Sequence, residues 1–274
     1  ELASPTRLTG PYTRPIPGIM MLRVLFIGLF AALIFPQFKS ASRRITFVLL
    51  LLCIGLVFMF ITGERMALML FSSGAIVVLF GLYLEQKKHQ TLVLCGTLII
   101  LFAFISTVLL FPEMAERSVY SISNKLNTFA NSDYGVVFRA AIAAWQENPL
   151  WGSGFHTYKS ICNEIGLLAQ WGAQWNMQCT HPHNLYLQLA AETGLFGLIL
   201  FSLMISAIYI KALQQHFHSK QWLATSLSFS VLTVCFWPLI GGISLFNNGV
   251  AALVWLGVGW ALSVNTIKIT AANG

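Results

Sequence analysis

The stretch ITFVLLLLCIGLVFMFIT, residues 45–62, carries no charged side chain and is apolar on every side of a helix. A strand of a membrane β-barrel would instead alternate polar and apolar residues over about ten positions. Backbone groups in hydrocarbon need partners within their own segment, and an α-helix supplies them. The stretch is therefore predicted to be a membrane-spanning helix.

The rest of the chain repeats this pattern. Of its 274 residues, 57% are hydrophobic and 9% are charged. Windows of about 19 residues predict seven spans, at residues 19–36, 45–62, 66–84, 91–111, 184–210, 222–241 and 243–262. The predicted fold class is an all-α integral membrane protein, a polytopic helical bundle.

Basic residues in the short connections set the orientation. They follow the first, third, fifth and seventh spans, at Lys39, Arg43, Arg44, Lys87, Lys88, Lys211, Lys220 and Lys268. All four places fall on one side, which is predicted to be cytoplasmic, although Arg7, Arg14 and Arg23 fall on the other. The net charge of +7 suits anionic lipid headgroups. No basic surface with interleaved aromatic residues indicates a nucleic-acid partner.

Four segments follow from this arrangement: an outer loop segment at 1–18, four spans at 19–111, a long outer loop at 112–183, and three spans with a short tail at 184–274. The first segment has neither an initiator methionine nor a signal-peptide pattern. We therefore expect further helices before Glu1. The 112–183 loop is too long for a plain connector, so it should contain helices of its own.

Two of the five cysteines, Cys162 and Cys179, lie in this outer loop. In an oxidising compartment they are expected to pair, which would fix the loop beside His181. Two free thiols are the alternative. Cys53, Cys95 and Cys235 lie within spans and are interpreted as core residues.

A helix is predicted in DYGVVFRAAIAAWQENP, residues 133–149, capped by Asp133 and ended by Asn148 and Pro149. Its spacing places Phe138, Ile142 and Trp145 on one face. Small alanines surround Arg139, which would let an anionic ligand reach its guanidinium; a solvated surface arginine is the alternative. Gly152 and Gly154 follow, and permit a tight turn.

The stretch HPHNLYLQLAAETGLFG, residues 181–197, gathers polar side chains at the head of an apolar run. Pro182 suits the first turn of a helix, so His181 is predicted at the cap and His183 in the first turn. Two faces are expected to differ. One is smooth, with His183, Leu187, Ala190, Gly194 and Gly197, and the other is polar, with Asn184, Gln188 and Glu192. The smooth face should allow close helix packing, and the polar face must avoid lipid.

The positive end of a helix dipole would keep His183 neutral, able to accept a proton, and would favour an anion beside it. A structural cap is one alternative. A metal site is another, but beyond His181 and His183 it needs a third ligand such as Glu164 or His156 at no diagnostic spacing. Arg65, in GERMAL, lies at the same side of the membrane, where snorkelling to headgroups is the plain interpretation. Together, two arginines and a neutral histidine describe a site for a lipid-linked diphosphate.

These motifs, in this order, resemble the O-antigen ligase and polymerase family of bacterial inner membranes. The family's His-Asn, nine residues, Gly, two residues, Gly pattern is met by His183, Asn184, Gly194 and Gly197. Its Arg, Trp, Asn-Pro-Leu-x-Gly-x-Gly run is met by Arg139, Trp145, Asn148, Pro149, Leu150, Gly152 and Gly154. Arg65 resembles the family's other diphosphate arginine.

The resemblance implies a C-type glycosyltransferase of about a dozen spans, of which this chain is a C-terminal part. It implies a glycan donor linked to undecaprenyl diphosphate, an active site facing the periplasm, and no metal or other cofactor. His183 would be the catalytic base and Arg65 and Arg139 would bind the diphosphate, supported by His181, Asn184, Gln188, Gly152, Gly154, Gly194 and Gly197.

The acceptor stays open in the sequence. A ligase would use lipid A–core, which is the favoured hypothesis, and a polymerase would use a second lipid-linked glycan. A protein O-oligosaccharyltransferase is less favoured. A transporter ranks lower, because the charges gather at one face rather than at the midplane. A purely structural membrane subunit is the remaining alternative.

Overall fold

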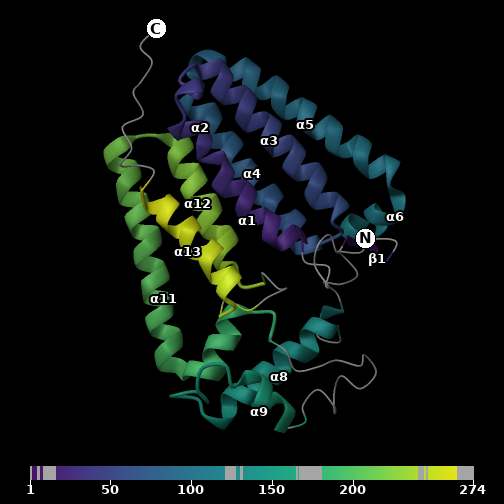
Figure 1. The fold of residues 1–274 in the computed structure, drawn as a ribbon, viewed down its shortest axis with the longest axis vertical. Coiled ribbons are helices and arrows are strands. Elements are labelled where there is room, and N and C mark those ends of the chain that lie inside the picture. Colours follow the sequence, from purple (N-terminus) through teal and green to yellow (C-terminus); the bar gives the residue numbers. More distant parts are fainter. Residues whose placement is uncertain are drawn as a thin grey trace. The chain divides into compact units, whose positions relative to one another are not determined.

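The computed structural model describes residues 2–4, 7–8, 17–120, 128–129, 132–164, 166, 181–239, 244 and 246–263. Cys179 and Lys268 lie outside these residues. Unit 1 comprises Glu1–Tyr120, Ile208–Cys235 and Ala252–Gly274, and unit 2 comprises Ser121–Ala207 and Phe236–Ala251. Each compact unit is described by itself (Figure 1).

Unit 1 contains most of the apolar helices. Its elements are α1 (Pro17–Leu29), α2 (Ala31–Ile34), η1 (Pro36–Phe38), α3 (Ala41–Ile61), α4 (Arg65–Glu85), η2 (Lys87–His89), α5 (Gln90–Leu110), α6 (Pro112–Ala115) and η3 (Glu116–Tyr120). It also takes the end of α11 (Leu185–Ser219), most of α12 (Trp222–Phe236) and most of α13 (Asn248–Ser263). Apart from a short antiparallel pair, β1 (Leu2–Ser4) and β2 (Arg7–Leu8), the regular elements of the described residues are helices, which agrees with the predicted all-α class.

Small residues let the helices of unit 1 pack closely. The ring of Phe26 in α1 occupies the space beside Gly74 in α4, and the ring of Phe71 lies against Gly55 in α3. Phe26 and Phe71 also contact each other, with ring centroids 5.3 Å apart. Since hydrocarbon gives helices little hydrophobic reason to associate, such close packing is what holds them together.

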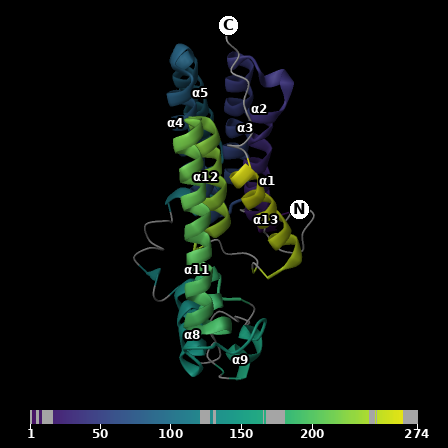
Figure 2. The same ribbon diagram turned by 90° about the vertical axis from the view of Figure 1, so that its left-hand side faces the viewer.

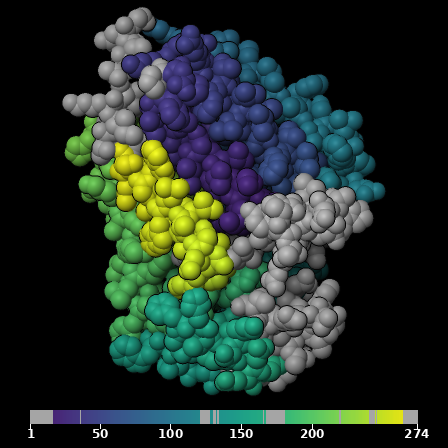
Figure 3. Space-filling model, in the orientation of Figure 1, coloured from purple at the N-terminus to yellow at the C-terminus, as the bar shows by residue number. Residues whose placement is uncertain are grey.

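Helices from the two ends of the chain meet within unit 1. The yellow atoms of α13 lie against the purple atoms of α1 in Figure 3. Between α1 and α2, Phe30 stacks on Trp260 of α13, with ring centroids 5.8 Å apart. Beside them, α12 runs along the end of α11 (Figures 1 and 2), and Thr225 contacts Nδ1 of His216 at 2.8 Å. Unit 1 is thus a single helical bundle.

Five helical segments among the described residues are long and apolar enough to cross a membrane: Pro17–Ile34, Ala41–Ile61, Arg65–Glu85, Lys87–Leu110 and Leu185–His218. They match the first five predicted spans, and the chain is a multi-pass membrane protein. The other two predicted spans are shorter helices, α12 and α13. Residues that precede a proline leave the helical conformation, so α12 ends at Phe236, just before Trp237 and Pro238.

Candidate functional site

Unit 2 is built around two helices of the segment 112–183 and the start of α11. Helix α8 (Asp133–Glu147) confirms the predicted helix, and α9 (Tyr158–Glu164) follows it. The predicted cap is wrong by one residue. Ser132 holds the N-cap position, and its hydroxyl accepts a hydrogen bond from the Gly135 N–H at 3.4 Å. Serine is as good a cap as aspartate.

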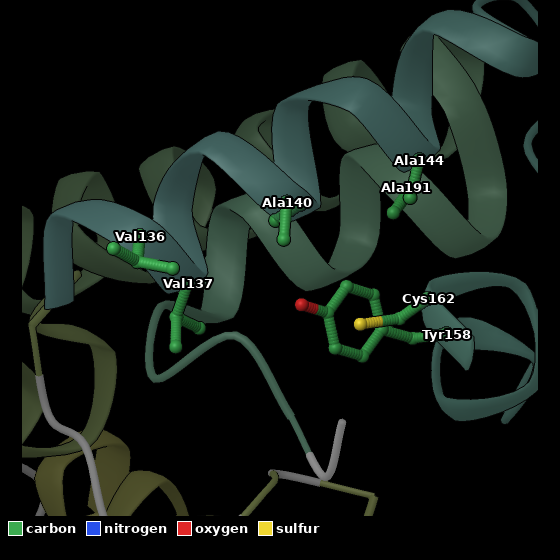
Figure 4. Close-up of a cluster of buried hydrophobic side chains, with 8 residues drawn as sticks. Val136, Val137, Ala140, Ala144, Tyr158, Cys162 and Ala191 are labelled. Atoms are coloured by element: carbon green, nitrogen blue, oxygen red, sulfur yellow. The ribbon is translucent and has the colours of Figure 1, made fainter. Parts of the chain in front are cut away.

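The buried face of α8 consists of small side chains. They lie in the interior of unit 2 together with residues of α9 and α11 (Figure 4), and Trp145 packs against the cluster from its edge. The cluster consists of Val136, Val137, Ala140, Ala141 and Ala144 of α8, Tyr158 and Cys162 of α9, and Ala191 of α11. Ile142 is 40% exposed. The small side chains of α8 and α11 allow these helices to approach closely and leave room for the fully buried ring of Tyr158.

The loop after α8 exchanges main-chain hydrogen bonds with α11. In a regular helix the carbonyls of Ala191 and Glu192 would accept from residues 195 and 196. Here they accept from the loop, from the N–H groups of Ser153 at 3.1 Å and Gly154 at 2.8 Å. The displaced N–H groups of Leu195 and Phe196 donate to the loop carbonyls, Pro149 at 2.9 Å and Leu150 at 3.3 Å. Four bonds thus cross between loop and helix, and we call this arrangement the interlock.

Two glycines make the interlock sterically feasible. Gly194 has φ 65° and ψ −167°, a non-helical conformation that breaks α11 into two helical parts. A Cβ there would fall on the main chain of Leu150 and Trp151. Gly152 has φ 71°, and a Cβ there would fall on the main chain of residues 192–194. The expectation that Gly194 belongs to a smooth helix face is therefore wrong, because it is the point at which the helix breaks.

Side chains add to the interlock from both partners. The Trp145 indole donates to the Pro149 carbonyl at 2.9 Å, and the Ser153 hydroxyl donates to the Ala191 carbonyl at 2.9 Å. The side chain of Thr193 fills the space where Gly197 has no Cβ. The two glycine-bearing sequence motifs are thus parts of one structure, formed by segments some 40 residues apart.

His183 lies before α11 and not in its first turn. The helix begins at Leu185, and the side-chain oxygen of Asn184 caps it by accepting from the N–H groups of Tyr186 at 2.9 Å and Leu187 at 3.1 Å. The predicted start, with His181 as the cap, is too early because asparagine is a strong N-cap residue and histidine is not. His183 itself has φ 51°, in the left-handed region that most side chains avoid.

Two aromatic rings contact the half-buried imidazole of His183. The ring of His181 is 4.2 Å away between centroids, and Tyr134, from the first turn of α8, meets it edge-on at 5.7 Å. Burial lowers the pKa of His183 below its ordinary value of 6.5. The neutral ring predicted from the sequence is thus favoured by loss of water around the charged form.

The predicted polar face of α11 is turned into unit 2. Gln188 and Glu192 are 5% and 2% exposed. One Glu192 carboxylate oxygen accepts from the Gln188 amide at 3.2 Å and from the Tyr158 N–H at 3.4 Å. The Ser244 hydroxyl donates to the Gln188 carbonyl oxygen at 3.0 Å. Glu192 therefore avoids lipid, as expected, by joining α11 to the start of α9.

The two predicted arginines lie in different units. Arg139 is exposed on α8, about 7.5 Å along the helix axis from Tyr134. Arg65 is the first residue of α4 in unit 1, and its Nε donates to the Arg117 carbonyl at 2.7 Å. Its neighbour Glu64 accepts from the N–H groups of Gly18 at 2.7 Å and Ile19 at 3.2 Å. Glu64 is thus engaged at the start of α1.

The structure bears on two further expectations, a metal site and a disulfide bond. Among the described residues, no group of three or more His, Cys, Asp or Glu side chains could hold a metal ion. Cys162 is buried and disulfide-bonded. Its expected partner, Cys179, lies outside the described residues, so that pairing stays a prediction.

Sequence reasoning missed two residues that contribute to this site. Tyr134 reaches His183 from a helix some 50 residues earlier, and Ser244 reaches Gln188 from a segment after α12. Neither carries a local signal, because each acts through a long-range contact. The Ser132 cap could have been found, since serine directly precedes the predicted helix.

Comparison with known proteins places these motifs in one family. The sequence family described as O-antigen ligase (Wzy_C) matches residues 49–202. A putative polysaccharide ligase of Rickettsia bellii (strain RML369-C) is 28% identical over 196 residues, 70% of this chain and 44% of that protein. The chain thus spans less than half the length of this curated relative, and no solved structure matches it. Since the family match covers more than half of the 274 residues, the chain belongs to the O-antigen ligase family.

Proposed function

We propose that this chain carries the catalytic site of an O-antigen ligase, a C-type glycosyltransferase of the bacterial inner membrane. It would transfer a glycan from undecaprenyl diphosphate to lipid A–core on the periplasmic side. The observation that carries the proposal is His183, a half-buried histidine with a lowered pKa in a left-handed conformation directly before a capped helix. The family description and the name of the Rickettsia relative favour a ligase over a polymerase.

His183 is proposed as the general base. The acceptor hydroxyl attacks the anomeric carbon of the donor sugar, the bond from that carbon to the diphosphate oxygen breaks, and the hydroxyl proton passes to the imidazole. The product is inverted at the anomeric carbon, and the diphosphate leaves with its lipid. General-base assistance of this kind contributes about 10²–10⁴ in rate.

The conformation of His183 supports this role. A non-glycine residue with positive φ is held there only by its surroundings, at a cost on the order of 1–3 kcal/mol, and such residues gather at functional sites. Here the Asn184 cap follows directly, and the rings of Tyr134 and His181 lie on the imidazole. These contacts fix the ring's direction before substrate arrives, which suits a base that must meet one hydroxyl.

Arg139 is proposed to stabilise the charge that develops on the leaving diphosphate. A guanidinium matches phosphate oxygens with two parallel hydrogen bonds, and in this role it replaces a divalent cation. Arg139 is exposed, whereas the alanines beside it are buried. Arg139→Ala should therefore abolish transfer without disturbing the packing of α8. Gln146→Ala, at another exposed position of the same helix, is the control and should leave transfer unchanged.

Arg65 is proposed as a second diphosphate ligand on the family resemblance. Within unit 1 its Nε is bound to the Arg117 carbonyl, which orients the terminal nitrogens. Lysine has no counterpart of Nε and cannot bind in two directions at once. Arg65→Lys should thus lose most activity although it keeps the charge.

The experiment is a lipopolysaccharide gel from the native host without this gene, with lipid-linked glycan measured alongside. A ligase predicts bare core and long glycan stranded on the lipid carrier. Core carrying a single repeat would instead identify a polymerase. Unchanged lipopolysaccharide with loss of glycan from a protein would identify a protein O-oligosaccharyltransferase.

A further inference from the structure

The interlock carries an exposed apolar surface that its hydrogen bonds do not explain. Its members are Leu150, Trp151 and Phe155 of the loop and Leu195 and Phe196 of α11, which we call the kink patch. Trp151 is 70% exposed, Phe155 65% and Phe196 50%. Trp151 and Phe196 stack on each other, with ring centroids 4.7 Å apart.

Main-chain contacts of the interlock hold the residues of the patch in place. Leu150 and Phe196 share a main-chain hydrogen bond, and Trp151 directly precedes the glycine that lies on residues 192–194. The interlock therefore orients these rings outward together. An exposed cluster of large apolar side chains indicates a contact surface.

The surface next to the kink patch indicates what covers it. Beyond Gly194, α11 continues with an exposed aliphatic surface that includes Ile199, Leu200 and Leu203. This surface belongs to a membrane-spanning helix of a multi-pass membrane protein, so lipid covers it. The kink patch extends the same surface by one turn of helix and one loop, and its tryptophan is typical of the interface between hydrocarbon and water.

The length of α11 also indicates where the hydrocarbon of the bilayer ends along this helix. The apolar segment Leu185–His218 has 34 residues, and the two helical parts on either side of Gly194 add up to about 51 Å, against roughly 30 Å of hydrocarbon. One end or both must therefore leave the hydrocarbon. The stretch from Leu195 to Leu213 is about 28 Å long and contains one charged residue, Lys211, near its end. It fits the bilayer when the boundary lies at Gly194.

We propose that the kink patch lies in the outer lipid interface of the bilayer, with Trp151 and Phe196 among the headgroups and upper acyl chains. The interlock then marks the membrane surface, and residues 181–193 stand above it. The first part of α11, from Leu185 to Gly194, is about 14 Å long, so His183 is placed on the aqueous side of this boundary and not at the mouth of the span. This inference concerns membrane depth and does not depend on the proposed reaction.

Nitroxide labels on the whole protein in lipid vesicles test the proposal. Cys53, Cys95 and Cys235 are replaced by alanine, and disulfide-bonded Cys162 does not react with the label. The same protein without an added cysteine is the control for any labelling of Cys179. Labels go at Trp151→Cys and Phe196→Cys. Glu147→Cys, exposed on α8, is the aqueous reference, and Leu203→Cys is the hydrocarbon reference. Relaxation by oxygen, which enters lipid, is compared with relaxation by a water-soluble nickel chelate.

The expected result is a ratio of oxygen to nickel relaxation at both patch positions that falls between the two references. A ratio equal to that of Glu147→Cys would place the patch in water, and a ratio equal to that of Leu203→Cys would place it deep in the bilayer. An immobile label reached by neither agent would show that another protein segment covers the patch. Each of these three results overturns the proposal.

A second measurement avoids cysteine variants that fail to fold. Tryptophan fluorescence of the unmodified protein is compared with that of Trp151→Phe in vesicles whose lipids carry bromine near the headgroup or near the chain end. The Trp151 contribution, obtained by difference, should be quenched more strongly by bromine near the headgroup. Equal quenching by both lipids, or none by either, contradicts the proposal.

Discussion

Replacing Gly194 with alanine should release the loop at 149–154 from α11. The residue has φ 65° and ψ −167°, a region that only glycine adopts readily, and its missing Cβ leaves room for the main chain of Leu150 and Trp151. An alanine can relieve both problems if α11 straightens. In that state Leu195 and Phe196 donate to Ala191 and Glu192, as in any helix, and the loop loses all four of its partners.

The size of the effect follows from two backbone terms. Alanine in the native conformation costs about 1–3 kcal/mol. In the straight helix, alanine stabilises the helical conformation by about 1 kcal/mol relative to glycine. The equilibrium between interlocked and straight forms therefore shifts by roughly 2–4 kcal/mol, about 30- to 700-fold. The clash of the new Cβ with the loop adds to this shift.

Hydrogen exchange of backbone amides distinguishes this outcome from general unfolding. In Gly194→Ala the amides of Ser153 and Gly154 should lose protection. Those of Leu195 and Phe196 should keep it, because these N–H groups then donate to helix carbonyls instead of loop carbonyls.

Two control variants separate the causes. Gly166→Ala has a positive φ of 64° but nothing within 4 Å of its Cβ, and Gly259→Ala in α13 has neither a positive φ nor a close neighbour. Both should leave the four amides unchanged. Full protection of Ser153 and Gly154 in Gly194→Ala, or equal loss at all four positions, would refute the exchange of hydrogen bonds.

Other predictions concern the helix start and the proposed chemistry. Burial disfavours the protonated form of His183, so its pKa lies below 6.5 and transfer should persist at pH 6.5 and fail only at lower pH; a midpoint at or above 6.5 in the rate profile would argue against this base. Asn184→Ala should destabilise the start of α11 by about 1 kcal/mol, and Asn184→Asp should restore stability and function because it keeps the capping oxygen. Equal failure of both variants in complementation would mean that the amide contacts substrate. Glu192→Ala removes the acceptor of the Tyr158 N–H, and should lower the yield of monodisperse protein in size-exclusion chromatography; a normal yield would show that this bond is dispensable. Excess EDTA should leave transfer intact, and a loss reversed by Mg²⁺ would exclude the metal-free mechanism.

The spans could be predicted because their signal is local. Residues 45–62 are apolar throughout, and the structure places a helix at Ala41–Ile61. The same holds for α8, whose end is marked by Asn148 with Pro149, although its cap is Ser132 and not the predicted Asp133. Caps and prolines act on their immediate neighbours, so the sequence alone reveals them.

The interlock could not be predicted because its determinants are distant. Gly194 fits a small-residue face of a helix by spacing, and only contact with the loop around Gly152 shows that the helix breaks there. The buried face of α8 is a similar case. Spacing groups Phe138 and Ile142 on one face of α8, but only the packing against Ala191 shows that the alanines are the buried residues. The left-handed conformation of His183 likewise depends on its surroundings.

The central claim is that His183 is the base for glycan transfer, and rescue of the native host without this gene tests it most directly. The full-length gene is introduced unchanged, as His183→Ala, or as His218→Ala. His218 is an exposed histidine near the other end of α11 and serves as the matched control. Full-length lipopolysaccharide is expected with the unchanged gene and with His218→Ala. With His183→Ala, at equal protein level, bare core and glycan stranded on the lipid carrier are expected. Normal lipopolysaccharide from His183→Ala would show that His183 is not the base.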